Sequence, residues 1–186
     1  MTLLLGSCAS RAPALSAADT RDDPRSKPYV IGPSDVVRIT VWKNPELSAE
    51  AVVRPDGTVT MPVVGELRAS GRTAADLQKD ATDRARTLVN DAVVTVSVVE
   101  VNSYRFTVAG NVEHPGLFTS RYYLTVSDAI ALAGGPNRYA NTSDVTITRN
   151  GAQGPQRIRV DYEGILAGKS PDQDVVLHAG DAVRVP

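Results

Sequence analysis

The first strong pattern in the chain is an alternation over residues 35–42, where valine or isoleucine stands at every second position from Val37. A period of two is typical of a strand that buries one face and leaves the other outward. Arg38, Thr40 and Trp42 fall on the outward face of this predicted strand. Their side chains are therefore available for contacts beyond the core of their own domain.

Two short apolar runs follow, at residues 51–53 and 58–61, on either side of Arg54-Pro55-Asp56-Gly57. The order proline, aspartate, glycine favours a tight reversal of the chain. We therefore expect the two runs to pair with each other as a β-hairpin.

A helix is predicted to begin after Thr73, whose side chain can cap it together with Asp76 three residues later. Apolar residues recur on one face of this helix, at Leu77, Ala81, Ala85 and Leu88. Asn90-Asp91 ends the helix, and residues 92–101 (AVVTVSVVEV) predict a strand with valine on both sides. Such a strand is typical of a sheet covered on both faces.

The second half of the chain begins with an alternating strand at residues 104–110. Thr125 and Asp128 repeat the capping pattern of a helix start, and residues 133–136 (AGGP) supply the glycine and proline that end a helix. Further elements are predicted as strands at 144–148, 157–161, 174–177 and 182–185, and as one helical turn near 163–166. The fold class is therefore α+β, with one small domain over residues 29–102 and a second over 103–186.

Length and charge narrow the classes of function. A chain of 186 residues holds one ordinary domain or two small ones, and 42% hydrophobic residues suffice for a core. A net charge of −1, with no block of basic residues, argues against nucleic acid as a partner. No apolar run approaches the roughly twenty residues of a membrane-spanning helix. Contact with a membrane would need an anchor or a partner protein.

Catalytic groups are sparse. The two histidines, His114 and His178, lack metal-ligand spacing to each other or to a cysteine, and both fall in predicted turns or loops. No serine-elbow or phosphate-cradling motif occurs. A glycosidase would need a pair of carboxylates, and the first domain offers Asp35, Glu46, Asp56 and Glu66. We interpret Asp35 and Asp56 as turn residues, and expect neither an enzyme nor a cofactor or metal site.

Aromatic residues make up 5% of the chain and leave two interpretations open. Sugars stack on aromatic faces, and Trp42, Tyr122, Tyr123 and Tyr139 lie at predicted outward or loop positions. The same rings could instead close the core or contacts between subunits, which is the interpretation we favour. Low aromatic content also suits a passage that must hold its cargo weakly.

Leu5-Gly6-Ser7-Cys8 is similar to a bacterial lipobox, in which small residues precede a cysteine that is acylated after cleavage. Residues 9–28, rich in Ala, Ser, Asp, Arg and Pro, predict a flexible tether behind it. Only Met1 to Leu5 precede the lipobox, so residues 1–8 form a truncated signal segment and we expect the native start further upstream. Ala9 in place of aspartate after Cys8 favours sorting to the outer membrane.

The order of motifs in the first domain resembles that of the outer-membrane polysaccharide export family. The residues that carry this resemblance are Gly32, Pro33, Asp35, Trp42, Pro45, Glu46, Leu47, Ser48, Arg54, Pro55, Asp56, Gly57, Pro62 and Gly65. The second half resembles the soluble-ligand-binding β-grasp (SLBB) domain. Its matching residues include Gly110, Pro115, Gly116, Gly134, Gly135, Gly180 and Asp181.

The resemblance implies a lipoprotein at the periplasmic face of the outer membrane, anchored through Cys8, that exports capsular polysaccharide or exopolysaccharide. It implies partners in four places: further copies forming a ring, the exported polysaccharide, an inner-membrane co-polymerase and a separate outer-membrane barrel protein. With one SLBB domain before Pro186, the chain looks like a short form of the family. We expect Arg38, Thr40 and Asp56 at subunit or passage surfaces. Two alternatives stay open, a monomeric module that binds a small ligand or carbohydrate, and an adaptor between co-polymerase and barrel.

Overall fold

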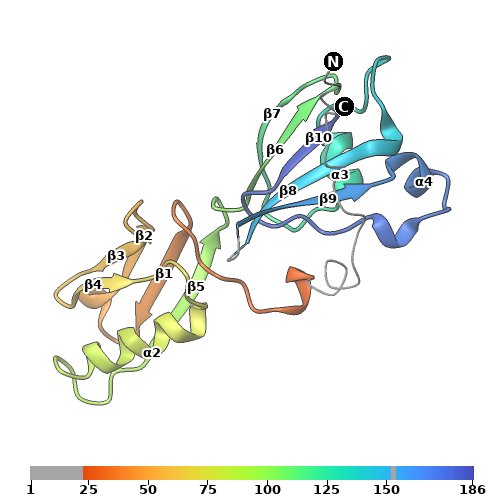
Figure 1. Cartoon of the computed structure of the whole chain (residues 1–186). Coiled ribbons are helices and arrows are strands. Elements are labelled where there is room, and N and C mark those ends of the chain that lie inside the picture. The colour runs from red at the N-terminus through yellow and green to blue at the C-terminus, as the bar shows by residue number, and fades with distance from the viewer. Residues whose placement is uncertain (1–22, 152–153) are drawn as a thin grey trace, which may run out of the picture.

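The alternating stretch forms β1 (Val36–Val41), the middle strand of a three-stranded antiparallel sheet with β2 (Ala49–Val52) and β5 (Val94–Glu100). The computed structural model describes residues 23–151 and 154–186 and shows two domains joined end to end (Figure 1). The expected signal segment, the lipidation site Cys8 and the tether up to residue 22 lie outside the described residues. Within residues 23–28 of the expected tether, η1 (Pro24–Ser26) is a short 3-10 helix.

The core of the first domain lies between this sheet and the helix α2 (Ala74–Ala85). Val37, Ile39 and Val41 point inward as the alternation predicts, with at most 2% of each residue exposed. The capping box also forms as predicted: the Thr73 hydroxyl accepts from the Asp76 amide, and the Asp76 carboxylate accepts from the Thr73 amide. This exchange satisfies backbone groups that a helix start leaves without partners.

The prediction that residues 51–53 and 58–61 pair with each other is wrong. The chain does reverse at residues 54–57, but β2 pairs with β1, while β3 (Thr58–Met61) pairs with β4 (Gly65–Arg68) in a separate two-stranded sheet. The turn sequence identified the reversal and not the partner strands. Each of the two apolar runs beside a turn can pair with a different strand instead of with the other run.

Two further expectations about the first domain are wrong. The α-helix ends at Ala85, so Leu88 lies beyond it and is 50% exposed. The strand β5 buries Val94 and Val96 only, while Thr95, Ser97 and Val99 on its other face are exposed. The valines on both sides of this strand therefore do not have a covering layer on both sides within the described chain.

The second domain is built on a five-stranded sheet with the order β7-β6-β10-β8-β9 (Figure 1). The last strand of the chain lies in the middle, parallel to β6 and antiparallel to β8. These strands are β6 (Arg105–Gly110), β7 (Gly116–Thr119), β8 (Val145–Gly151), β9 (Gly154–Val160) and β10 (Ala182–Val185). The helices are α3 (Val126–Leu132) and α4 (Tyr162–Leu166), with 3-10 turns η3 (Thr142–Asp144) and η4 (Pro171–Gln173).

The helix signals of this domain are confirmed, and one strand is not. Thr125 and Asp128 form the second capping box, and Gly134 and Gly135 follow the end of α3 with positive φ angles of 83° and 85°. Residues 174–177 do not form a strand, because their only sheet-like contact is the isolated bridge between Thr125 and Val176. Their apolar side chains are buried, which explains the pattern without a ladder of hydrogen bonds.

Candidate functional site

The turn before β1 carries a buried carboxylate that holds the connection between the two domains. Asp35 is 0% exposed. Its Oδ1 accepts from the amides of Asn102 (2.8 Å) and Ser103 (2.7 Å). Its Oδ2 accepts from the Tyr29 hydroxyl (2.6 Å), the Gly32 amide (2.8 Å) and the Ser103 hydroxyl (3.0 Å). These five donors satisfy the carboxylate without a cation.

Asp35 is therefore more than the turn residue that the sequence predicts. It ties the entry into β1 to the linker that leads into the second domain, more than sixty residues away along the chain. The pKa of the Tyr29 phenol is raised, first by burial and second by the hydrogen bond to Asp35. No local spacing in the sequence points to this arrangement, because the partners of Asp35 are set by the tertiary fold.

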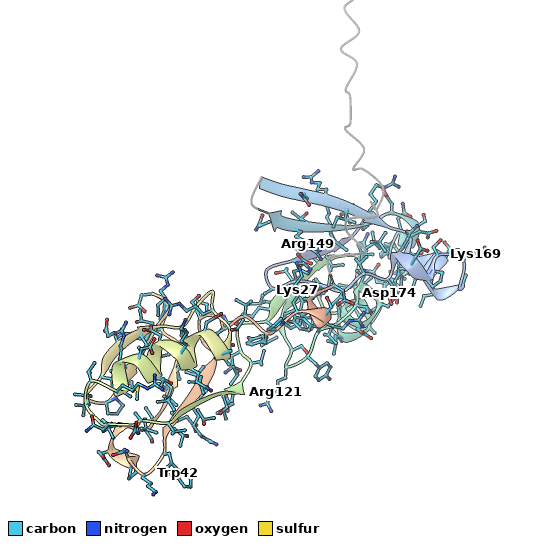
Figure 2. All side chains as sticks on the ribbon, turned by 90° about the horizontal axis from the view of Figure 1, so that it is seen from below. Lys27, Trp42, Arg121, Arg149, Lys169 and Asp174 are labelled. Atoms are coloured by element: carbon cyan, nitrogen blue, oxygen red, sulfur yellow. The ribbon has the colours of Figure 1, made fainter. Side chains whose placement is uncertain are left out.

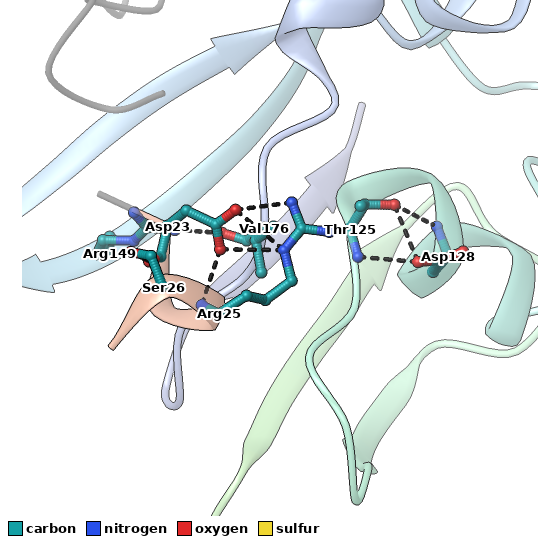
Figure 3. A network of polar contacts seen from close by, with 7 residues as sticks. All are labelled: Asp23, Arg25, Ser26, Thr125, Asp128, Arg149 and Val176. Carbon is teal, nitrogen blue, oxygen red and sulfur yellow. Dashed lines mark hydrogen bonds and ion pairs between the residues drawn. The ribbon is translucent and has the colours of Figure 1, made fainter. Parts of the chain in front are cut away.

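A second buried carboxylate occupies the corresponding place in the second domain. Asp181 is 1% exposed and accepts from Arg149 Nη2 at 2.7 Å and from the His178 amide at 2.8 Å. Arg149 also donates to the carbonyl of Val176, so it holds both ends of the turn that leads into β10 (Figure 3). The 3-10 helix η1 lies beside this link, where the Asp23 carboxylate accepts from Arg25 (Figure 3).

The two turns are built alike. Residues 30–39 (VIGPSDVVRI) and 176–185 (VLHAGDAVRV) place an aspartate directly before a strand, after a residue with positive φ. That residue is Ser34 (77°) in the first domain and Gly180 (88°) in the second. In each turn the carboxylate accepts an amide hydrogen from three residues earlier. Asp35 and Asp181 therefore hold the turns through which the chain enters β1 and β10.

The segment after β1 divides into buried and outward residues. Leu47, in the 3-10 helix η2 (Pro45–Leu47), is 4% exposed, and the Ser48 hydroxyl accepts from the Val41 amide at 2.9 Å. Trp42 is 67% exposed and lies on the surface of the first domain, and Glu46 is also exposed (Figure 2). Leu47 and Ser48 thus anchor the segment and leave Trp42 and Glu46 free to contact another molecule.

The Arg54–Gly57 turn is confirmed and is held by its own polar groups. Asp56 accepts from the hydroxyl and the amide of Thr58, at 2.7 and 2.9 Å, and these hydrogen bonds lower the pKa of Asp56. Arg54 pairs with Glu66 across the neighbouring strands at 2.5 Å. Gly57 has φ +83°, a conformation that suits glycine. Asp56 is exposed on this turn, as a surface contact requires.

The connection between β3 and β4 ends in a strained, exposed valine. Val63 has φ +62°, and the amide of Val64 donates to the carbonyl of Pro62 across it at 2.6 Å. A β-branched residue is a genuine outlier in this conformation. Val63 is also 75% exposed, so burial does not compensate the strain. A solvent-exposed apolar residue held under strain is typical of a loop that contacts another molecule.

Replacing Val63 with asparagine is expected to raise the free energy of unfolding by about 1 kcal/mol, because asparagine tolerates the left-handed region. Urea denaturation would measure the change. The matched control is Val52→Asn, an exposed valine in the extended strand β2, where asparagine is disfavoured and stability should fall. A lower stability of the Val63→Asn variant would contradict the strain argument.

One face of the three-stranded sheet is uncovered. We call it the outward sheet face, and its members are Arg38, Thr40, Trp42, Glu50, Val52, Val93, Thr95, Ser97 and Val99. Helix α2 covers the opposite face, and no other element of the described residues lies over this one (Figure 1). Val52, Val93 and Val99 are 58%, 60% and 41% exposed. The polar side chains of Arg38 and Thr40 on the middle strand lie between these valines. The face is therefore a mixed surface, whose exposed valines another protein would bury.

Arg38 and Thr40 stand on this face, as the alternation predicts. Arg38 forms an ion pair with Glu50 on β2, at 2.7 Å between Nη2 and Oε2. Thr40 lies opposite Thr95 on β5. The strands β2 and β5 on either side of β1 are the edge strands of this sheet. The sheet therefore has two unpaired edges as well as an uncovered face.

Two motif glycines of the second domain, Gly110 and Gly134, have neighbours too close for a Cβ atom. At Gly110, with φ +93°, a Cβ atom would lie 2.0 Å from the Val185 carbonyl oxygen, so any other residue would push β6 and β10 apart. Pro115 and Gly116 stand at the start of β7.

The described residues contain no group of three or more His, Cys, Asp or Glu side chains that could hold a metal ion. His114 is exposed, and His178 is positioned through its backbone at Asp181. The lowered pKa of Asp56 is opposite to what the general acid of a glycosidase needs. Within the same described part of the chain, no helix combines the length and apolarity needed to cross a membrane.

Comparison with known families gives the class of this protein. Residues 23–99 match the model of the family described as "Polysaccharide biosynthesis/export protein", and residues 105–160 match the SLBB domain. The chain thus carries a polysaccharide export domain followed by an SLBB domain. The resemblance seen in the sequence motifs is confirmed. Asn102 and Ser103, which bind Asp35, lie between the two matched ranges.

Several proteins named for polysaccharide export are similar to this chain. The chain is 28% identical over 187 residues to "EPS I polysaccharide export outer membrane protein EpsA" of Ralstonia solanacearum, covering 87% of this chain and 48% of EpsA. It is 27% identical over 170 residues to "Capsule polysaccharide export protein BexD" of Haemophilus influenzae, covering 81% of this chain and 42% of BexD. It is 30% identical over 139 residues to "Capsule polysaccharide export outer membrane protein CtrA" of Neisseria meningitidis, covering 73% of this chain and 33% of CtrA. The chain spans about half the length, or less, of these relatives.

Proposed function

We propose that this chain is a subunit of a polysaccharide export apparatus at the periplasmic face of the outer membrane. Copies of the chain close into a ring, and a capsular polysaccharide or exopolysaccharide passes outward through it. The single observation that carries the proposal is the export domain followed by an SLBB domain, in a chain similar to proteins named for polysaccharide export. The family concerns export and not catalysis, so no chemical step is assigned to the chain.

The outward sheet face supports self-assembly. A small domain that leaves a three-stranded sheet uncovered on one side exposes apolar surface that a neighbouring copy can bury. A head-to-tail contact of this kind closes into a ring when its rotation divides a full turn. We assign Arg38, Thr40 and the Asp56 turn to the subunit or passage surfaces on this basis.

The proposed partners follow from the direction of transport. An inner-membrane co-polymerase would deliver the polymer from the periplasmic side, and a separate outer-membrane barrel protein would receive it. Lipidation at Cys8 would hold the ring at the outer membrane. A single acyl chain binds bilayers weakly, so further acylation or the avidity of many subunits would supply stable attachment.

The first experiment measures the native mass and the projected shape of the detergent-extracted full chain by mass spectrometry and electron microscopy. A closed particle with an open centre is the expected result. A compact particle without an opening would favour an adaptor between co-polymerase and barrel. A monomer in the native membrane extract would overturn the ring. A strain that lacks the gene yet keeps its surface polysaccharide would overturn the export function itself.

One observation favours the second candidate, a module that binds a small ligand or a carbohydrate. A cleft of about 550 Å³ lies where the two domains meet, within the range typical of ligand sites. Ligand-dependent thermal stabilisation of a chain that remains monomeric would support this candidate.

A further inference from the structure

Tyrosines gather where the two domains meet. Of the six tyrosines in the chain, four line hollows at this junction: Tyr29, Tyr104, Tyr122 and Tyr123. They come from the start of the first domain, from the residue after the linker, and from the loop between β7 and α3. In a chain with 5% aromatic residues, this is a pronounced concentration at one place. We call these four residues the tyrosine track.

The tyrosine track lines three neighbouring hollows, and adjacent hollows share tyrosines. The largest is the cleft of about 550 Å³, and Tyr29, Tyr104 and Tyr123 line both this cleft and a small hollow of about 30 Å³ beside it. Tyr122 and Tyr123 line both the small hollow and a further cleft of about 450 Å³. The small hollow has about the volume of one water molecule, so no sugar unit fits inside it. An occupant of both clefts would cross between them over the exposed ring of Tyr122, which favours an elongated ligand.

The four rings differ in how firmly they are held. Tyr104 is buried, and its hydroxyl donates to the Leu177 carbonyl at 3.0 Å. Tyr123 packs edge-on against Tyr104, with 5.1 Å between ring centroids. Tyr29 is fixed by its hydrogen bond to Asp35. Tyr122 is 72% exposed, and so presents most of its ring to solvent. The track therefore has a rigid base and one open platform.

Polar groups line the same hollows. Lys27, His178 and the Ser103 hydroxyl line the large cleft, and Arg121 lines the small hollow at the junction (Figure 2). Aromatic faces with hydrogen-bonding groups beside them suit a sugar ring, which presents apolar C–H faces and hydroxyl groups together. The Arg121 guanidinium would also pair with a carboxylate of an acidic glycan.

We infer that the tyrosine track binds an extended stretch of glycan chain, several sugar units long, across the junction of the two domains. The inference rests on the proposed export function and names where the cargo touches this chain. Contact through a few rings on an open surface holds a polymer weakly, as a passage requires, because cargo that binds tightly at one place does not move on.

The test is a titration of the isotope-labelled full chain with two linear probes, neutral cellohexaose and acidic hyaluronan octasaccharide, followed by NMR. We expect at least one probe to shift the amide signals of residues 29, 103–104 and 121–124, with a Kd of about 1 mM. The probe that binds more tightly identifies a neutral or an acidic glycan as the preferred class. Shifts confined to other regions, or no shifts with either probe, would overturn the inference.

Variants at the open platform make the test specific. Tyr122→Ala is expected to weaken binding about fivefold, while Tyr122→Phe, which keeps the ring, leaves it near the original value. The matched control is Tyr139→Ala, since Tyr139 is 68% exposed but lines none of the three hollows and stacks with Arg138 instead. Equal binding by the Tyr122→Ala and Tyr139→Ala variants would overturn the role of the track.

The outcome is distinguishable from failure of the export function. If the full chain forms an open ring and its deletion removes surface polysaccharide, but neither probe shifts the track, the inference fails and the export function stands. If a probe binds the track while deletion leaves surface polysaccharide unchanged, the export function fails and the glycan site stands as a binding module.

Discussion

Replacing Asp35 with alanine is expected to lower the free energy of unfolding by about 3–5 kcal/mol, the largest stability effect that we predict for the chain. The substitution removes the acceptor from two linker amides, Asn102 and Ser103, and from the Gly32 amide. It also leaves the hydroxyls of Tyr29 and Ser103 without this partner. Buried donors that lose their acceptor retain the full cost of desolvation.

The measurement combines chemical denaturation with hydrogen exchange resolved by residue. In the Asp35→Ala variant, the Asn102 and Ser103 amides should exchange faster than the amides of β1 relative to the wild-type chain, because the linker loses its anchor first. Asp35→Asn keeps the size and one acceptor oxygen and should have an intermediate effect. Asp56→Ala is the control, since its carboxylate also accepts two hydrogen bonds but lies at the surface. A loss no larger for Asp35→Ala than for Asp56→Ala would contradict the anchoring role.

The same residue shows where prediction from sequence ends. The two capping boxes were predictable because each hydrogen-bonded pair, such as Thr73 with Asp76, lies within three residues. The inward face of β1 was predictable because the period of two is a local property of the strand. The partners of Asp35 lie 67 and 68 residues away along the chain, and nothing in its local pattern selects them.

The prediction of which strands pair was wrong for a related reason. The turn at residues 54–57 was visible in the sequence, but whether the run at 58–61 pairs backward or forward depends on the competing strand at 65–68. Residues 174–177 were apolar enough for a strand and are buried, yet the fold gives them only one bridge. A short apolar run has the same sequence pattern whether it pairs in a sheet or is only buried. The sequence therefore does not distinguish a strand from a buried irregular segment.

The tyrosine track was only partly visible. The sequence singled out Tyr122 and Tyr123 as outward or loop rings, and left sugar contact and closure of the core as alternatives. Tyr123 packs on the core, as the second alternative predicts, while Tyr122 is exposed. Tyr29 joins them from the other domain, which only the tertiary structure brings together.

The wrong prediction that β5 is covered on both faces leads to the second prediction with a large expected effect, on assembly. Valines on both sides of this strand predicted a covered sheet, and the covering layer is absent from the described chain. If a neighbouring copy supplies that layer, the outward sheet face is an interface, and reversing its charges should disrupt assembly. The Arg38–Glu50 pair is suited to this test, because the two residues lie opposite each other on β1 and β2.

We expect Arg38→Glu to raise the dissociation constant of the assembly about 100-fold or more, since like charges placed against a partner surface cost several kcal/mol. The double swap Arg38→Glu with Glu50→Arg restores the pair within the chain and reverses the positions of its charges. An exposed pair contributes about 0.2–1 kcal/mol to folding, so both variants should remain folded by circular dichroism. Sedimentation velocity would report their assembly.

The double swap separates the two roles of the pair. If Arg38 and Glu50 serve only the fold of one chain, the double swap recovers assembly because their ion pair is rebuilt. If the face is an interface, the double swap stays dissociated, because the neighbouring copy still meets each charge in the wrong place. Full assembly and unimpaired export by the Arg38→Glu variant would remove Arg38 from the proposed interface. Dissociation of both variants, with the fold intact, would establish that the layer missing over β5 comes from a second copy of the chain.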